Sequence, residues 1–138
     1  MSSTPNFAGT LQPFAARVQN SDGTNKVAVC SAGSSTARKI SAISLSSTDT
    51  SDRAISFILT VSSVDYLICT VTAPANAGTV NATPPLNVLS HSNWTWFEYD
   101  ANGNKVFTIP ASSVLYAQSA VTVTSTKQVA VVGNAQDY

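Results

Sequence analysis

The chain has 138 residues, with seven basic and seven acidic side chains. Only 10% of its residues are charged, against about a quarter in an average soluble protein, and about a quarter are serine or threonine. A chain of this length is expected to form one domain and to bury about two-thirds of the surface that its unfolded form exposes. Because no run of basic residues occurs, we expect neither nucleic acid nor a membrane surface as a partner.

The near-zero net charge bears on solubility. Little long-range repulsion keeps free copies apart near neutral pH, which suits a protein that is assembled with other subunits. The opening MSSTPNFAGT has no basic region followed by an apolar stretch, and no apolar run approaches the ~20 residues that span a bilayer. We therefore expect a soluble protein that is made in the cytosol.

The two cysteines, Cys30 and Cys69, each lie in an apolar strand-like run. This setting favours two buried thiols over a disulfide, since cytosolic thiols usually stay reduced. Two cysteines and one histidine cannot supply the four ligands of a usual structural zinc site. We expect no metal and no cofactor.

Residues 1–25 are predicted to be an extended N-terminal arm, and residues 26–138 the β-sandwich domain. The arm lacks regular alternation, and its prolines, Pro5 and Pro13, block helix and disfavour pairing in a central strand. Such an arm either packs along its own domain or reaches a neighbouring subunit. Its isolated apolar anchors are Phe7, Leu11 and Phe14.

From residue 25 onward the pattern has period two, which is typical of half-buried strands. In one run Ile55, Phe57 and Leu59 fall on one face and Ser56 and Thr60 on the other. The predicted strand runs are 25–33, 37–47, 52–63, 65–74, 104–113, 114–125 and 127–135. Almost no helix is expected, since no window carries helical spacing. The pattern predicts an all-β fold, either a single antiparallel β-sandwich (jelly-roll or Ig-like) or a small barrel.

Two connections follow from turn chemistry. Residues 62–65 are short enough to be a hairpin turn, so the runs on either side should pair antiparallel. Residues 73–87, APANAGTVNATPPLN, are too rich in Pro, Gly and Asn for a strand, and we expect them to cross from one sheet to the other. No internal repeat or second domain is visible.

The segment 91–107, HSNWTWFEYDANGNKVF, holds both tryptophans and the one histidine. Its Asp and Asn residues resemble a calcium loop, but Gly103 comes too early and Ala111 stands where the closing glutamate belongs, which argues against calcium. Asn102-Gly103 instead favours a tight type I′ turn, so that 95–100 and 105–110 form a hairpin.

The aromatic residues of this hairpin are the best candidate binding surface. Trp94 and Trp96 are predicted to share one strand face, with Phe97 on the other, and one of the two faces should be core. The other face is then free to anchor a protein partner or to stack on sugars. With the apolar anchors of the arm, the candidate interface comprises Phe7, Leu11, Phe14, Trp94, Trp96, Phe97 and Tyr99.

An enzyme is not expected. His91 lies between Ser90 and Ser92, but in so serine-rich a chain this adjacency carries no information, and no catalytic motif or carboxylate pair is recognisable. The sequons at Asn81 and Asn93 are discounted, because they are read only in a eukaryotic secretory pathway.

Several stretches together resemble a group of small all-β virion proteins of tailed bacteriophages. The resemblance covers most of residues 25–138 and is carried by S-T-D-T at 47–50, V-D-Y-L at 64–67, P-A-N-A-G-T at 74–79, F-T-I-P-A at 107–111 and the final D-Y. The chain departs from the group in WTWFEYD at 94–100, which has more tryptophan than expected and leaves room for a specialised contact.

The resemblance implies a structural component of the phage particle and no catalytic residues. The function predicted first is a capsid decoration or cement protein that is made in the host bacterial cytoplasm. It would bind the outer surface of the virion head, bridge subunits of the major capsid protein, and assemble as a homo-oligomer, with a trimer favoured. The alternatives are a carbohydrate- or receptor-binding module on a tail or fibre, and a head-to-tail or tail-tube component.

Overall fold

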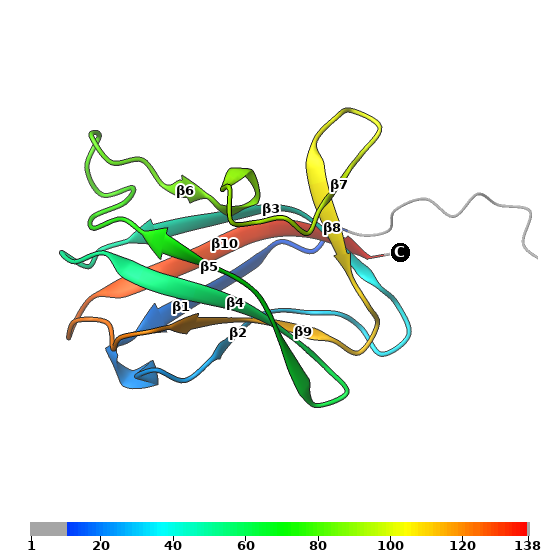
Figure 1. Cartoon of the computed structure of the whole chain (residues 1–138), viewed down its shortest axis with the longest axis horizontal. Coiled ribbons are helices and arrows are strands. Elements are labelled where there is room, and N and C mark those ends of the chain that lie inside the picture. Colours follow the sequence, from blue (N-terminus) through cyan, green and yellow to red (C-terminus); the bar gives the residue numbers. More distant parts are fainter. Residues whose placement is uncertain (1–10, 138) are drawn as a thin grey trace, which may run out of the picture.

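A computed structural model describes residues 11–137 and gives a sandwich of two antiparallel sheets (Figure 1). The described part holds no α-helix, and therefore none that could cross a membrane. Its elements are β1 (Phe14–Gln19), η1 (Asn20–Asp22), β2 (Val27–Ser31), β3 (Arg38–Ser47), β4 (Arg53–Val61), β5 (Val64–Ala73), β6 (Leu86–Asn87), η2 (Val88–Ser90), β7 (Glu98–Tyr99), β8 (Lys105–Ile109), β9 (Val114–Ser119) and β10 (Gln128–Asp137).

The larger sheet has six strands in the order β1-β10-β3-β8-β7, with β6 paired to β3 beside this path. The smaller sheet has four strands in the order β2-β9-β4-β5. The two sheets are separate hydrogen-bonded units, so the sandwich is confirmed and the small barrel is not. Each sheet draws strands from both halves of the sequence, and the chain therefore passes between the sheets repeatedly.

The predicted alternation is confirmed in β4. Ile55 and Phe57 are fully buried, while Ser56 and Thr60 lie on the outer face. Strands from both sheets direct such residues inward, and the apolar side chains form one continuous core. Each large aliphatic or aromatic side chain that is fully buried contributes about 1.5 to 3 kcal/mol relative to leaving it in water.

Part of the predicted arm belongs to the larger sheet. β1 pairs antiparallel with β10, from Phe14 opposite Gly133 to Gln19 opposite Gln128, and Val18 is fully buried. Its pattern is too short to stand out in the sequence, and Pro13 directly before it is tolerated because β1 is an edge strand. Of the two possibilities for the arm, this part packs along its own domain.

The β4–β5 hairpin is confirmed, with a two-residue turn. Ser62 and Ser63 have φ values of 50° and 63°, and Val61 pairs with Val64. Positive φ at both central residues is the type I′ geometry, which matches the twist of the flanking strands. The predicted crossing is also confirmed, because the chain leaves β5 in the smaller sheet and joins the larger one at β6.

The prediction of a strand over 114–125 is wrong beyond Ser119, where β9 ends. Val121 is 59% exposed, whereas Val123 is fully buried and Thr124 donates its backbone N–H to Asp49. The alternating segment AVTVT at 120–124 therefore belongs to a loop. The carboxylate of Asp49, which is distant in sequence, holds this loop in place.

We predict that Gly133→Ala destabilises the fold by about 2 to 3 kcal/mol, as expected of overpacking in a well-packed region. A Cβ at this position would overlap the Ala42 carbonyl oxygen and Cζ of Phe14, whose ring occupies the place of the missing side chain. Urea unfolding measures the change. Ala15→Ser, at an exposed position of β1, is the control and should shift the free energy of unfolding by less than about 0.5 kcal/mol. A Gly133→Ala variant as stable as the control would contradict this packing.

Candidate interaction surface

Trp94 is a core residue. It is 1% exposed, and its ring lies 5.6 Å from that of Phe57 in an edge-on arrangement and 4.8 Å from that of Phe107. Its indole Nε1 donates a 2.8 Å hydrogen bond to the main-chain oxygen of Trp96, so the one polar atom of the buried ring is satisfied. The interface role predicted for Trp94 therefore does not fit the structure.

The prediction that Trp94 and Trp96 share a strand face is also wrong. Residues 94–97 are not a strand, and only Glu98 and Tyr99 pair with β8, so the hairpin is shorter than predicted. Trp96 is 38% exposed, and its ring centroid lies 5.2 Å from that of Phe107. Trp96 thus covers the core beneath it and still presents part of its ring to solvent.

Phe97 and Tyr99 form an aromatic pair on this hairpin. Their ring centroids are 5.5 Å apart in an edge-on arrangement, and Lys105 Nζ lies 4.4 Å from the centre of the Phe97 ring. Phe97 is half-buried against the core, whereas Tyr99 is 65% exposed. Of the predicted aromatic residues within 11–137, Tyr99 and Trp96 are the most exposed and so the most available to a partner.

The loop of the hairpin is held by Asp100. Its Oδ1 accepts the backbone N–H groups of Asn102 and Asn104, both at 2.9 Å, and these bonds lower the pKa of Asp100. Within residues 100–104 only Gly103 has a positive φ, so the predicted type I′ turn at Asn102-Gly103 is replaced by a three-residue loop that ends in a left-handed glycine. The Asp100 carboxylate thus stabilises the loop that follows it.

The predicted anchors in the arm differ in their surroundings. Leu11 is 65% exposed and forms an isolated bridge with Gln136. Phe14 is partly buried and packs against the core. Phe7 lies outside the described residues.

Three exposed apolar side chains lie within residues 64–67, at the tip of the β4–β5 hairpin, and the sequence pattern did not single them out as a surface. Val64, Tyr66 and Leu67 are 50%, 56% and 66% exposed. Val64 and Tyr66 pair with Val61 and Leu59 of the inward-facing row. Leu67 pairs with Ile58 of the outer row, so both faces of this tip carry apolar side chains. We call Val64, Tyr66 and Leu67 the hairpin tip.

An ionic contact ties the hairpin tip to the outer face of the smaller sheet. Lys26 Nζ lies 2.7 Å from Asp65 Oδ1 and 4.4 Å from the centre of the Tyr116 ring. Thr60 Oγ1 donates a 2.6 Å hydrogen bond to the same carboxylate oxygen. Hydrogen bonds from Lys26 and then from Thr60 lower the pKa of Asp65. The charge at the tip is thus neutralised locally.

A polar groove lies beside the β7–β8 hairpin. It has a volume of about 500 Å³, and its polar lining residues are Ser41, Asn87, Ser90, Asp100, Asn104, Lys105 and Asn134. Its amide and hydroxyl groups both donate and accept hydrogen bonds, and Asp100 and Lys105 add one charge of each sign.

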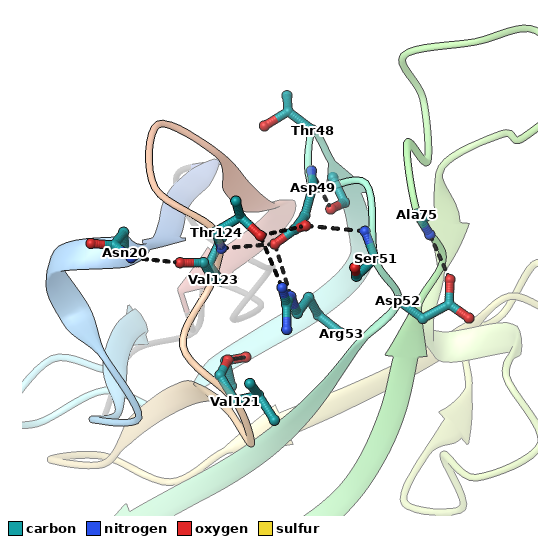
Figure 2. A network of polar contacts seen from close by, with 12 residues as sticks. Asn20, Thr48, Asp49, Ser51, Asp52, Arg53, Ala75, Val121, Val123 and Thr124 are labelled. Atoms are coloured by element: carbon teal, nitrogen blue, oxygen red, sulfur yellow. Dashed lines mark hydrogen bonds and ion pairs between the residues drawn. The ribbon is translucent and has the colours of Figure 1, made fainter.

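At the opposite end of the sandwich a buried carboxylate organises the loops (Figure 2). Asp49, which follows β3, is fully buried, and its Oδ2 accepts hydrogen bonds from Arg53 Nε at 2.8 Å and from the Thr124 N–H at 2.9 Å. Its Oδ1 accepts the Ser51 N–H at 3.1 Å and the Thr124 hydroxyl at 3.0 Å. Each carboxylate oxygen therefore accepts two hydrogen bonds.

These contacts outweigh the cost of burying the charge. Desolvation of Asp49 alone would raise its pKa, but the hydrogen bonds from Arg53, Thr124 and Ser51 together hold the pKa of this carboxyl well below its usual range. Asp49 is consequently ionised at neutral pH, and it acts as a structural anchor.

The other titratable groups of residues 11–137 form no recognisable reaction centre. His91 Nδ1 accepts the Asn93 N–H at 3.0 Å, and Ser90 donates its hydroxyl to the Asn87 carbonyl. Cys30 and Cys69 are buried free thiols, as predicted, and burial raises the pKa of each. Residues 11–137 contain no group of three or more His, Cys, Asp or Glu side chains that could hold a metal ion.

Comparisons of the chain with protein-family models, with curated proteins and with solved structures found no match. The described residues define a two-sheet antiparallel β-sandwich with an exposed apolar hairpin tip at one end. The resemblance to phage virion proteins remains a prediction.

We predict that Trp94→Ala lowers the free energy of unfolding much more than Trp96→Ala does. Trp94→Ala should cost about 3 to 5 kcal/mol, because it opens a large cavity in the core. Trp96→Ala should cost about 1 kcal/mol, since much of the ring is already in water. Thermal and urea unfolding measure both changes, and equal losses in the two variants would contradict the burial described here.

We predict that Asp49→Asn destabilises the protein by about 3 to 5 kcal/mol at pH 7, because Arg53 loses its buried partner. The folded-state pKa of Asp49 is depressed, so its contribution to stability is complete above the unfolded-state pKa of about 4 and is lost as the pH falls through the folded-state value. The gap between wild type and variant should therefore narrow below about pH 4.

Urea unfolding between neutral pH and strongly acidic pH tests this dependence. Asp65→Asn is the matched control, because Asp65 pairs with Lys26 at an exposed site. Its effect should be small at every pH, since exposed pairs are worth about 0 to 1 kcal/mol. A constant difference between wild type and Asp49→Asn across the whole range would rule out the role given to Asp49.

Proposed function

We propose that this protein is a structural component of a tailed-bacteriophage virion, acting as a decoration or cement protein on the outside of the head. The single observation that carries the proposal is the group of exposed apolar side chains at the hairpin tip. The resemblance of residues 25–138 to small all-β virion proteins supports the same reading. In this role the chain binds the major capsid protein and bridges adjacent subunits.

The hairpin tip has the chemistry of an interface anchor. Tyr66 and Leu67 can be buried by a partner at little cost, because the single charge beside them, Asp65, is already paired with Lys26. Aromatic residues at the centre of an interface carry much of its binding energy, and depletion of charge is typical of interface cores. Tyr99 and Trp96, at a second exposed hairpin, provide another contact of the same kind.

Avidity explains how a small surface can hold the protein in place. Three exposed side chains bury far less than the roughly 800 Å² per partner of a standard interface. A trimer that docks three times on a rigid lattice gains effective concentration, so modest single contacts suffice. A homotrimer on local three-fold positions of the head therefore fits the proposal better than a monomer does.

A carbohydrate-binding module on a tail or fibre is the second candidate. The polar groove favours it, since its amide and hydroxyl side chains suit a neutral sugar. Tyr99, next in sequence to the groove residue Asp100, is exposed and could stack on a sugar ring. A screen against immobilised glycans distinguishes this candidate from the first.

The proposed function is tested with heads purified from virions assembled without this chain. The purified protein should co-sediment with them in a fixed ratio to the major capsid protein. Leu67→Asp should weaken this binding about tenfold or more. Val121→Asp is the matched control, because Val121 is 59% exposed and lies in the loop at the opposite end of the sandwich. Folded protein that stays in the supernatant, or that binds isolated tails instead, would refute the proposal.

A further inference from the structure

We propose that the pocket between the η1 turn and the loop before β10 binds an oxyanion of the phosphate or sulfate class. The pocket has a volume of about 340 Å³, and its lining residues are two cations, three hydroxyl residues and three amide residues. It lies at the end of the sandwich where the Asp49 loops gather, opposite the hairpin tip (Figure 1). A ligand bound there would leave the hairpin tip free.

Arg17 and Lys127 give this pocket its positive charge. Three of the seven basic residues of the chain, Lys26, Arg38 and Arg53, are paired with carboxylates. Arg17 and Lys127 have no such partner within residues 11–137. Two cations in one pocket repel each other, and an anion between them replaces that repulsion with attraction. The pair therefore favours an anionic ligand.

The carboxylates of the adjoining loops are already engaged. Asp22, on η1, accepts the backbone N–H of Gln19 at 2.9 Å and is not among the lining residues. Asp49 is fully buried and has Arg53 as its ionic partner. The pocket thus keeps an uncompensated positive charge, whereas the polar groove beside the β7–β8 hairpin is lined by one charge of each sign.

The loop before β10 adds hydroxyl and main-chain donors. Lys127 donates its backbone N–H to the Thr124 carbonyl at 2.9 Å, which closes a tight turn, and Thr126 within that turn has a φ of 69°. A β-branched residue rarely adopts a positive φ, and such conformations cluster at ligand sites. The N–H groups of Ser125 and Thr126 have no main-chain partner within residues 11–137. Successive N–H groups of a turn form concave sites for anions.

A tetrahedral oxyanion suits this set of donors. The donors come from three segments, since Arg17 lies on β1, Ser21 on η1, and Ser125 and Lys127 in the loop before β10. A phosphate or sulfate group has oxygens that point in several directions, whereas the two oxygens of a carboxylate lie in one plane. An arginine fork binds two such oxygens at once, and a lysine ammonium supplies a point charge beside them.

The walls of the pocket are held in place without a ligand. Asn20 Nδ2 donates a 2.8 Å hydrogen bond to the Val123 carbonyl and so ties η1 to the neighbouring loop. In the same loop the Thr124 N–H is bonded to Asp49, as Figure 2 shows. A site that is formed in advance loses little conformational entropy on binding. A small anion can therefore bind without first ordering the loops.

Titration of the ¹⁵N-labelled full chain with sodium phosphate at constant ionic strength tests the site by NMR. The amides of Ser21, Ser125 and Thr126 should shift along one saturable curve with a dissociation constant in the millimolar range, and sodium sulfate should move the same amides. Arg17→Gln and Lys127→Gln should each weaken the binding about tenfold, because each removes a hydrogen bond to a charged group.

Lys39→Gln is the matched control. Lys39 pairs with Gln136 at the far end of β10, has no carboxylate partner within residues 11–137 and does not line the pocket. Its replacement removes the same charge and should leave the binding unchanged. Circular dichroism confirms that each variant is folded.

Glucose 6-phosphate should shift the same amides at least as readily as phosphate does, and glucose should not shift them. Shifts that are absent, that never saturate or that spread over the whole surface would overturn the proposed site. So would equal effects of Lys39→Gln and the two pocket variants, or acetate or glucose binding as tightly as phosphate. The titration contains no capsid, so its failure is distinct from a failure of the proposed attachment role.

Discussion

The buried Asp49 carboxylate is the contact on which the arrangement of the sheets depends. Asp49 lies in the connection from β3 in the larger sheet to β4 in the smaller one, and Thr124 lies in the connection from β9 back to β10. A third crossing, from β5 toward β6, joins them, since the Asp49 carbonyl accepts the Asn76 N–H at 2.9 Å and Asp52 accepts the Ala75 N–H at 2.8 Å. One acidic residue and its neighbours thus hold three passages between the layers, and buried polar groups of this kind stabilise only when every partner is present.

The three crossings around Asp49 lie at one end of the sandwich, and the connections β2–β3 and β8–β9 cross at the other. The loops around Asp49 are tied by side-chain and main-chain hydrogen bonds, and Asn20 adds a bond to the Val123 carbonyl from the η1 turn. The opposite end carries the β4–β5 turn and the start of the N-terminal strand, where exposed apolar side chains collect. This arrangement suits the proposed attachment role, because a firm scaffold lets short segments bind with little loss of conformational entropy.

The positions of the strands could be predicted from the sequence better than the identity of the exposed apolar residues. Period-two alternation located strands such as β4, because Ile55, Phe57 and Leu59 face a core that runs the length of the strand. The same rule failed at 120–125, because the alternation of apolar and polar residues in this loop looks the same as that of a strand. The hydrogen-bond partner of Thr124, Asp49, lies 75 residues away in the sequence. Trp94 was misread because its burial depends on Phe57 and Phe107. The hairpin tip could have been found from V-D-Y-L, which puts apolar residues on both faces of a strand end.

Native-state hydrogen exchange tests the role of Asp49 most directly. The account predicts that the amides of Ser51, Asn76 and Thr124, which lie in three different loops, exchange as slowly as amides in the core of β4, because all three open only when the sandwich unfolds. The Val121 amide, in the exposed part of the same region, provides the reference for an ordinary loop. Exchange of Ser51, Asn76 and Thr124 as fast as that of Val121 would contradict the account.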